Sequence, residues 1–241
     1  MIGFSFAGRP YGSRKLRPTA SGRSAECLFV PFTTSPSLRE SYCAGRQGRN
    51  HLSRCQFRLE DEQMESRRSA AFLDRDGVIN VDHGYVYQPH EFQWIAGAPE
   101  AIRYLNDSGY LTVVVTNQSG IARGYYTESE FWALQSWIDK CLHDFGAHID
   151  VVYFCPHLPD APLSMYRTDC KCRKPEPGML LQAIDDFSID PSSSFLIGDK
   201  ASDCTAAAAA SVDCHRFAGA DLLNFVRRVV SASSPEPHLP A

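Results

Sequence analysis

The sequence predicts an α/β fold in which a Rossmann-like parallel sheet carries helices on both faces. Two observations lead to this prediction. Short apolar runs alternate along residues 68–230 with amphipathic helical segments, as expected for a parallel sheet that is covered on both sides. Polar residues directly follow these apolar runs, where parallel strands present a ligand site. One helix and its approach fill the segment between the first two runs, so we expect no cap domain.

Local signals support the individual elements. Pro99 early in one helix and Gly109 after it are typical of a helix start and a helix stop. Thr127 and Glu130 have the spacing of a capping box at the start of a longer helix. We expect strands at 70–73, 111–115, 149–154 and 194–198, and helices at 99–110, 127–146, 177–187 and 201–210.

The composition favours a soluble protein. The chain has 241 residues, is 44% hydrophobic and carries a formal net charge of -4, which gives no general reason to expect nucleic acid or an anionic membrane as partner. No apolar run approaches the roughly 18 residues that a membrane span needs. The nine cysteines are odd in number and the chain is not small, so we expect a reducing, cytoplasmic location.

The two ends of the chain differ from its middle. Residues 1–59 are rich in Arg, Ser and Gly and show no sustained periodicity, a composition that a transit peptide or a nucleic-acid-binding arm would share. We interpret residues 1–67 as a disordered extension, with Met64 as an alternative start. Residues 68–230 are the expected folded domain, and 231–241 a disordered tail.

Charged, hydroxyl and amide residues follow three of the predicted strands. Any one of them alone would be better explained as a helix cap or a solvated loop residue. Their equivalent positions at one edge of the sheet instead predict a site. The residues are Asp74 and Asp76 after the first strand, Thr116 and Asn117 after the second, Asp199 and Lys200 after the fourth, and Asp203 one helical turn beyond.

These residue types suit phosphoryl transfer. Converging carboxylates repel one another unless a cation lies between them, and hard oxygen ligands favour Mg²⁺. A carboxylate at the metal can attack phosphorus and form an acyl phosphate. A second acid two residues later can protonate the leaving oxygen and then activate water. Thr116 and Lys174 would hold the phosphoryl oxygens.

The chain resembles the haloacid-dehalogenase-like phosphatases. The matching motifs are "DRDG" at 74–77, the "VVVTN" run that ends at 117, Lys174 within "CRKPEPGM", and "GDKASD" at 198–203. The resemblance implies Asp74 as nucleophile and Asp76 as general acid and base. It also implies Mg²⁺ held by Asp74, the Asp76 main-chain carbonyl and Asp199, with Asp203 positioning Lys200 or the outer surroundings of the metal.

Within that family, residues 70–210 look like the capless, histidinol-phosphatase-related sugar bisphosphate phosphatases, on the stretches "LDRDGVINVDHGYV", "VVVTNQSGIARGYYTE" and "CKCRKPEPGMLL". The resemblance implies removal of the C7 phosphate of a heptose 1,7-bisphosphate, on the way to the activated heptose of lipopolysaccharide core. The implied substrate contacts are Asp82, His83, Gly84 and Tyr85 at the sugar, and Thr116, Asn117, Gln118, Ser119, Arg173, Lys174 and Lys200 at the substrate or its phosphates. The likeness weakens after residue 211.

A second metal site is expected in the loop after the third strand. Two tight pairs of ligands, C-x-H and C-x-C, are formed by Cys155, His157, Cys170 and Cys172. Four such ligands close a tetrahedral structural Zn²⁺ site, and the family resemblance implies the same four. The loop ends at Arg173 and Lys174, so zinc would orient phosphate-binding residues. The remaining cysteines of the domain, Cys141, Cys204 and Cys214, are interpreted as buried thiols.

Two other functions fit parts of the sequence. Histidinol-phosphate phosphatases share the catalytic motifs and the zinc loop, but "VDHGYV" and "NQSGIARG" favour the sugar bisphosphate. A nucleic-acid-binding module would use the basic first segment and the zinc loop, but the domain is not basic and no Arg- and Lys-rich recognition helix follows that loop. We therefore expect a monomeric phosphoric monoester hydrolase with a small-molecule substrate and no nucleic-acid or membrane partner.

Overall fold

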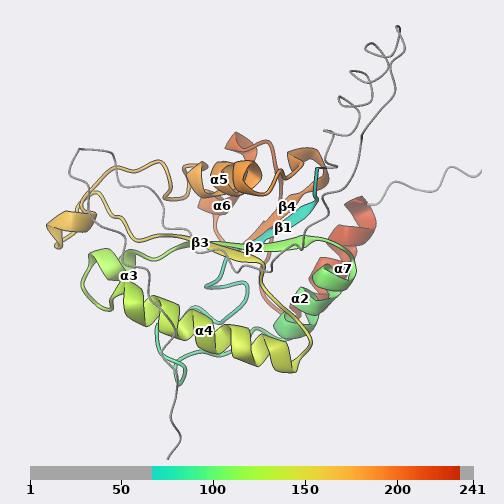
Figure 1. The fold of residues 1–241 in the computed structure, drawn as a ribbon, viewed down its shortest axis with the longest axis horizontal. Helices are drawn as coiled ribbons and strands as arrows, with labels where there is room; N and C mark the ends of the chain where they lie inside the picture. Colours follow the sequence, from blue (N-terminus) through green and yellow to red (C-terminus); the bar gives the residue numbers. More distant parts are fainter. Residues whose placement is uncertain (1–66, 234–241) are drawn as a thin grey trace, which may run out of the picture.

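The computed structural model describes residues 67–233, which form a parallel sheet in the order β3-β2-β1-β4-β5 with helices on both faces (Figure 1). The strands are β1 (Ala70–Leu73), β2 (Leu111–Asn117), β3 (Val151–Cys155), β4 (Phe195–Gly198) and β5 (Asp213–Arg216). The helices are α2 (Ala98–Asp107), α3 (Ser119–Ala122), α4 (Glu128–Asp144), α5 (Gly178–Asp186), α6 (Ala201–Ala209) and α7 (Leu222–Ser233). The predicted fold class is confirmed. The expected extension up to residue 66, with Met64, and the tail from 234 lie outside the described residues.

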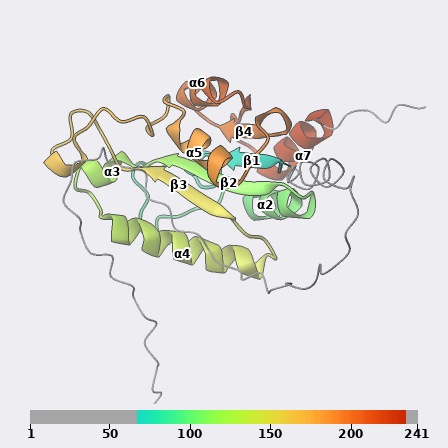
Figure 2. The same ribbon diagram turned by 45° about the horizontal axis from the view of Figure 1, so that its top comes forward.

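The helices form two layers around the sheet. Helices α5 and α6 cover one face, and α2, α4 and α7 cover the other (Figures 1 and 2). Alternate residues of β1 pack against the two helical layers, because successive side chains of a strand point to opposite faces. Phe72 lies in the core with Met179 of α5, and Leu73 lies in the core with Leu105 of α2. Both cores are therefore built on the same short strand.

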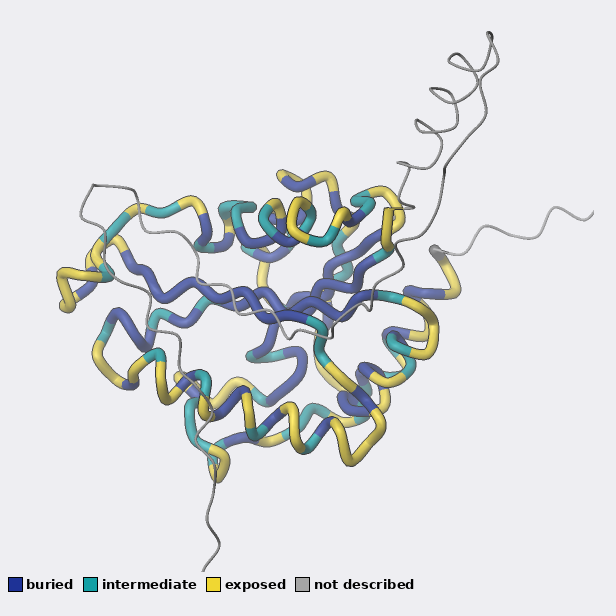
Figure 3. Tube along the Cα trace, viewed as in Figure 1, coloured by how far each residue is buried: buried dark blue, intermediate teal, exposed yellow. Residues whose placement is uncertain are grey.

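Strand β1 lies at the centre of the sheet and is buried along its whole length (Figure 3). Leu73, its last residue, lies opposite Val114 of β2 and Ile197 of β4. The polar residues that follow these three strands therefore meet at one edge. The described residues between β1 and β2 form a loop and α2, so they contain no separate cap domain.

The expected helix signals are present. Glu130 N donates to Thr127 Oγ1 at 3.2 Å, and Thr127 N donates to Glu130 Oε2 at 2.7 Å, so the capping box at the start of α4 is confirmed. Gly109 follows α2 with a φ of 82°, a backbone conformation that favours glycine. Strand β2 is longer than expected and includes Thr116 and Asn117.

The chain after residue 211 adds β5 and α7, which the sequence did not predict. Strand β5 pairs with β4 at the edge of the sheet, and Asp213 and Arg216 at its ends are exposed, so it lacks the apolar run of a central strand. Helix α7 packs against α2 on the same face and continues past residue 230 to Ser233. None of the helices in residues 67–233 is both long and apolar enough to cross a membrane.

The interpretation of Cys204 and Cys214 as buried thiols is wrong. These two half-buried residues form a disulfide with a Cα–Cα distance of 5.2 Å, which joins α6 to β5. The sequence pattern gave no sign of it because Cys204 lies in a helix and Cys214 in a strand that was not expected. Cys141, on α4, is a half-buried thiol.

Candidate active site

The end of β1 delivers Asp74 to the floor of the site. Asp74 N donates to Ile197 O at 3.0 Å, which continues the pairing of β1 with β4 beyond the last strand residue. The chain then turns, because Ile79 N and Asn80 N both donate to Arg75 O, at 2.8 and 3.1 Å. Asp74 is 5% exposed, so its carboxylate is held in one place by the sheet and the turn together.

Lys174 lies between two buried carboxylates. Its Nζ is 3.1 Å from Asp74 Oδ1 and 2.6 Å from Asp203 Oδ1, and it donates to Val115 O at 2.8 Å. The expectation that Asp203 positions Lys200 or the metal surroundings is therefore modified. Asp203 pairs with the Lys174 ammonium and accepts from the main-chain N of Lys200 at 2.9 Å. Sequence reasoning left Asp203 out of the site residues, although its place one turn after Asp199 was noted.

The backbone around Lys174 is fixed by β2. Asn117 Nδ2 donates to Lys174 O, and Lys174 N donates to Asn117 Oδ1, each at 3.0 Å. This reciprocal pair joins the end of the cysteine-containing loop to the carboxyl end of β2. Asn117 therefore positions the backbone of Lys174, in addition to its expected place at the substrate.

Three carboxylates, those of Asp74, Asp199 and Asp203, have oxygens within 4.8 Å of one another. Asp199 Oδ1 is buried and has no hydrogen-bond partner among the described residues, as a metal ligand would. Gly77 leaves room for the Asp199 carboxylate, since a Cβ on Gly77 would lie 2.5 Å from the other oxygen, Asp199 Oδ2. Lys174 lies closer to Asp203, at 2.6 Å, than to Asp74, at 3.1 Å, so the donor set suits a hard divalent cation held by Asp74 and Asp199.

Burial determines the protonation of these acids. It raises the pKa of Asp74 to about 6, with the nearby Asp203 and Asp76 charges adding to the effect and Lys174 opposing it. Burial also raises the pKa of Asp199. Both shifts mean that the charged forms of these buried carboxyl groups are disfavoured, and a bound cation would favour them.

A cleft of about 650 Å³ adjoins this floor at Lys174, and Asp74, Asp199 and Asp203 are not among the residues that line it. It is lined by the predicted residues Asp76, Asp82, Gly84, Tyr85, Asn117, Gln118, Ser119, Arg173, Lys174 and Lys200, and by Tyr126, Pro175 and Ser202, which were not predicted. Thr116 is buried beside the cleft and accepts from Gln118 Nε2 at 2.9 Å. His83 is exposed outside the lining, with Nε2 3.3 Å from Gln93 Oε1.

An ion pair spans the mouth of the cleft. Lys200 Nζ lies 3.1 Å from Asp82 Oδ2, linking the loop after β4 to the loop after β1. Although burial acts in the opposite direction, the Gly84 amide and Lys200 hold the pKa of Asp82 below its ordinary value. Because both side chains are partly exposed, an anionic ligand can compete with Asp82 for Lys200 at little cost.

The four expected zinc ligands come together. Sulfur and nitrogen distances among Cys155, His157, Cys170 and Cys172 run from 3.2 Å to 3.7 Å. A tetrahedral site with Zn–S bonds of about 2.3 Å would place its ligand atoms roughly 3.8 Å apart. The set therefore fits a tetrahedral metal. Contact with Cys172 and burial raise the pKa of the Cys155 thiol, as expected for thiols crowded together without a cation.

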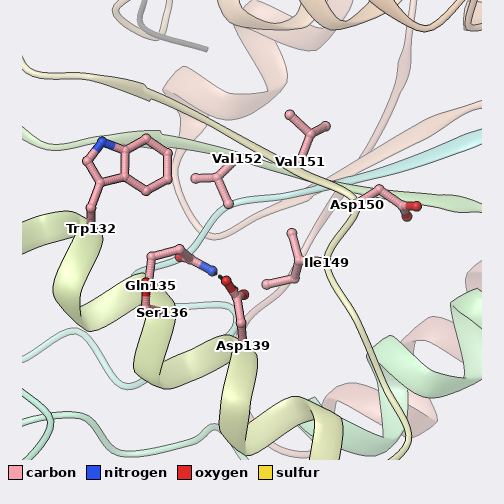
Figure 4. Close-up of a pocket in the computed structure, with 8 residues that line it drawn as sticks. All are labelled: Trp132, Gln135, Ser136, Asp139, Ile149, Asp150, Val151 and Val152. Carbon is pink, nitrogen blue, oxygen red and sulfur yellow. Dashed lines mark hydrogen bonds between the residues drawn. The ribbon is translucent and has the colours of Figure 1, made fainter. Parts of the chain in front are cut away.

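A smaller hollow of about 260 Å³ lies between α4 and β3, away from these residues (Figure 4). Trp132 and Asp139 line it from α4, and Ile149 and Val152 line it from the other side. Gln135 Nε2 donates to Asp139 Oδ1 at 2.8 Å, so the carboxylate is already partnered. None of the predicted site residues lines this hollow.

Comparisons with known proteins agree with this site. A sequence model of the family described as polynucleotide kinase 3 phosphatase matches residues 70–226. The chain belongs to this family. It is also 51% identical over 145 residues to the D-glycero-beta-D-manno-heptose-1,7-bisphosphate 7-phosphatase of Pasteurella multocida. The matched residues cover 60% of this chain and 78% of that relative. The enzyme of the same name from Escherichia coli (strain K12) is 51% identical over 143 residues, or 59% of this chain and 75% of the relative. This family member is a phosphatase, as expected.

Solved structures place the phosphatase among the haloacid-dehalogenase-like folds. A putative had-like phosphatase from mesorhizobium loti superposes with a TM-score of 0.62 at 31% identity, over 70% of this chain and 89% of that one. The D,D-heptose 1.7-bisphosphate phosphatase from B. bronchiseptica, complexed with magnesium and phosphate, gives a TM-score of 0.59 at 28% identity, over 68% of this chain and 99% of that one. The predicted family resemblance is confirmed.

Proposed function

We propose that this phosphatase removes the C7 phosphate of D-glycero-D-manno-heptose 1,7-bisphosphate, with Mg²⁺ and through an aspartyl phosphate on Asp74. The substrate is suggested by relatives that are 51% identical and carry that activity in their names. The chemistry rests on one observation above the others. The buried Asp74 carboxylate lies 3.1 Å from the Lys174 ammonium and beside Asp199, at the sheet edge beneath the cleft.

In the first step an oxygen of Asp74 attacks the phosphorus of the C7 phosphate, and the bond from phosphorus to the sugar oxygen breaks. The sugar oxygen keeps the electron pair and takes a proton from Asp76. Lys174 balances the charge that Asp74 and the phosphoryl oxygens bring together. Thr116 Oγ1 already accepts from Gln118, so its own hydroxyl hydrogen is available to a phosphoryl oxygen.

In the second step Asp76, now a carboxylate, takes a proton from a water molecule whose oxygen attacks phosphorus. The bond from phosphorus to Asp74 breaks and its electron pair returns to the Asp74 carboxylate. The products are inorganic phosphate and the heptose 1-phosphate, and Asp76 is protonated for the next cycle. Every atom and proton is supplied by the substrate, water and these two residues.

The metals have separate roles in this proposal. Asp74, Asp199 and the main-chain carbonyl of Asp76 would hold Mg²⁺, which when bound neutralises charge on the transferring phosphoryl group. A structural Zn²⁺ would be held by Cys155, His157, Cys170 and Cys172, and would fix the loop that ends at Arg173.

The cleft lining supports a bisphosphate substrate. Arg173 and Lys200 provide positive charge at the cleft in addition to Lys174. We assign contacts with the sugar to Asp82, Gly84 and Tyr85, which line the cleft, and to His83 of the same loop, which lies outside the lining. We assign contacts with the phosphates to Asn117, Gln118, Ser119, Arg173, Lys174 and Lys200. The proposal includes the expected place in activated-heptose synthesis for lipopolysaccharide core, a monomer without nucleic-acid partners and a cytoplasmic location. In a reducing cytosol Cys204 and Cys214 would be thiols, and their disulfide would form in the purified protein under oxidising conditions.

A phosphate-release assay tests the substrate assignment. The purified protein is given heptose 1,7-bisphosphate as each anomer, histidinol phosphate, and an oligonucleotide with a 3′-phosphate, each with Mg²⁺ or with EDTA. We expect the heptose bisphosphate to be the best substrate by kcat/KM and EDTA to abolish turnover. A preference for histidinol phosphate or for the oligonucleotide would overturn the assignment of the heptose bisphosphate as substrate. Full turnover in EDTA would overturn the metal requirement.

A further inference from the structure

The residue between the two catalytic aspartates is one of the most deeply buried large side chains among the described residues. Arg75 is 1% exposed, although an arginine in this position of a loop is ordinarily solvated. Burying a guanidinium is unfavourable unless it is paired and hydrogen-bonded. We therefore expect the buried Arg75 guanidinium to have a charged partner and hydrogen-bond acceptors close by.

Arg75 directs its guanidinium at Asp76. Nη2 lies 3.0 Å from both Asp76 oxygens, and Nε lies 3.3 Å from Asp76 Oδ1. Nη2 also donates to Val86 O at 2.7 Å, and the cation lies 5.5 Å from the centroid of the buried Phe131 ring. The apolar ring on α4 and the carbonyl of Val86 hold the guanidinium in place, so the guanidinium is a fixed partner for Asp76.

Two amides hold the same carboxylate. Asn80 Nδ2 donates to Asp76 Oδ1 at 3.0 Å, and Gln118 Nε2 donates to Asp76 Oδ2 at 2.9 Å. Gln118 is itself fixed, because Tyr126 donates its hydroxyl hydrogen to Gln118 Oε1. Both oxygens of Asp76 are therefore oriented from the side of the loop, while Asp76 still lines the cleft.

We propose that Arg75 is a positioning residue that fixes the orientation in which Asp76 transfers its proton. The inference rests on the proposed role of Asp76 as general acid and base. Proton transfer requires the carboxyl oxygen to lie within hydrogen-bond reach of the leaving oxygen. A misplacement of about 1 Å can lower a rate on the order of 10²-fold. Arg75 makes three contacts with Asp76 and is the charged member of the group that holds it.

The test compares two substrates that differ in their need for an acid. A sugar phosphate has a poor leaving group that must be protonated, whereas p-nitrophenyl phosphate releases a phenolate that leaves without a proton. For Arg75→Met we expect kcat/KM for heptose 1,7-bisphosphate to fall by about 10- to 10²-fold. We expect kcat/KM for p-nitrophenyl phosphate to fall by less than about 3-fold, since attack by Asp74 does not depend on Asp76. Equal losses on both substrates would mean that Arg75 only supports the fold, and would overturn the inference.

Four further variants keep the test decisive. Asp76→Asn should show the same selective loss, and adding Arg75→Met to it should cost nothing further, because both changes remove one function. Arg75→Lys keeps the charge in a smaller group and should lose less than Arg75→Met, which covers the case in which Arg75→Met does not fold. The control is Arg227→Met, which removes an arginine stacked on Tyr104 outside the cleft and should change neither rate.

The outcomes separate this inference from the proposed function. If wild-type protein releases no phosphate from the sugar bisphosphate, the proposed substrate is wrong. If Asp76→Asn lowers kcat/KM, which reports the first step, equally on both substrates, the acid role of Asp76 is wrong; a fall in kcat on both substrates follows from its role as base in the second step. If Asp76→Asn is selective and Arg75→Met and Arg75→Lys are not, the positioning role of Arg75 alone is wrong.

Discussion

Asp203 Oδ1 lies 2.6 Å from Lys174 Nζ, and both side chains are 1% exposed. The contact joins the first turn of α6 to the end of the cysteine loop, which carries Cys170 and Cys172 and ends at Lys174, beneath the cleft. Gly198 makes it possible, because a Cβ on Gly198 would lie 2.4 Å from Asp203 Cβ. The charge that faces the Asp74 nucleophile is therefore held in place from a different element of the sheet edge.

Removing Asp203 should destabilise the protein. Asp203→Ala leaves Lys174 with one of its two carboxylate partners, and breaking a buried pair on one side costs about 3–5 kcal/mol. Denaturant unfolding measures the loss. The control is Asp107→Ala, which breaks the exposed pair with Arg103 at 3.5 Å and should change the free energy of unfolding by less than about 1 kcal/mol. Equal effects of the two variants would contradict the structural role of Asp203.

Binding of Mg²⁺ should weaken in acid. Burial raises the pKa of Asp74 to about 6, so the folded protein holds a proton between about pH 4 and 6 that the unfolded chain has released. The stability of the metal-free protein should therefore fall as the pH rises through this window. Because Mg²⁺ needs the carboxylate, its affinity should fall below about pH 6, by up to roughly tenfold per pH unit.

Calorimetric titration with Mg²⁺ at pH 5, 6 and 7.5 checks this prediction. Asp74→Asn should remove most of the binding at all three values. Burial also raises the pKa of Asp139, which lies in the hollow beside α4, so Asp139→Asn is a matched control that should leave the Mg²⁺ titration unchanged. An affinity that is independent of pH would contradict the role of Asp74 as a ligand.

Cys170→Ser should lower both the zinc content and the rate. A serine hydroxyl is a far poorer zinc ligand than a thiolate, so the loop that ends at Arg173 and Lys174 should loosen. We expect turnover to fall on the order of 10²-fold with the Mg²⁺ requirement unchanged. Metal analysis of the purified protein is paired with kinetics, and Cys141→Ser serves as the control. Fully active wild-type protein without zinc would contradict the proposed zinc site.

The Cys204–Cys214 disulfide should contribute to stability. It closes a loop with a sequence separation of 10, for which the chain-entropy account gives about 2–3 kcal/mol. We expect the double variant Cys204→Ala and Cys214→Ala to unfold at correspondingly lower denaturant concentration, with kcat unchanged. Thiol titration of the denatured wild-type protein provides the second measurement. If both cysteines react without prior reduction, the pair is not bonded in solution.

The sequence could predict the sheet because β1, β2, β3 and β4 each contain an apolar run. The same runs showed where Asp74, Thr116 and Asp199 would converge, since the ends of parallel strands share an edge. Strand β5 was missed because its residues are partly exposed and polar. Helix α3 was missed because it has four residues, too few for a periodic pattern.

Contacts between distant segments were beyond the sequence. The pairing of Asp203 with Lys174 depends on how α6 and the cysteine loop pack. The residues next to Asp203 and Lys174 in the sequence do not predict it. The burial of Arg75 was also hidden, because a charged residue between two acids in a loop indicates a solvated position. Its actual partner is the next residue, Asp76, in an environment completed by Phe131 of α4.

The central claim is that Asp74 is a covalent nucleophile, and the stereochemical course at phosphorus tests it most directly. A substrate analogue whose transferring group is a thiophosphoryl group, made chiral with two oxygen isotopes, is hydrolysed in water labelled with the third isotope, so that the inorganic thiophosphate released is itself chiral. Transfer to Asp74 and then to water inverts phosphorus twice, so we predict net retention of configuration, together with loss of turnover in folded Asp74→Asn. Net inversion would mean that water attacks the substrate directly, and would contradict the aspartyl-phosphate mechanism.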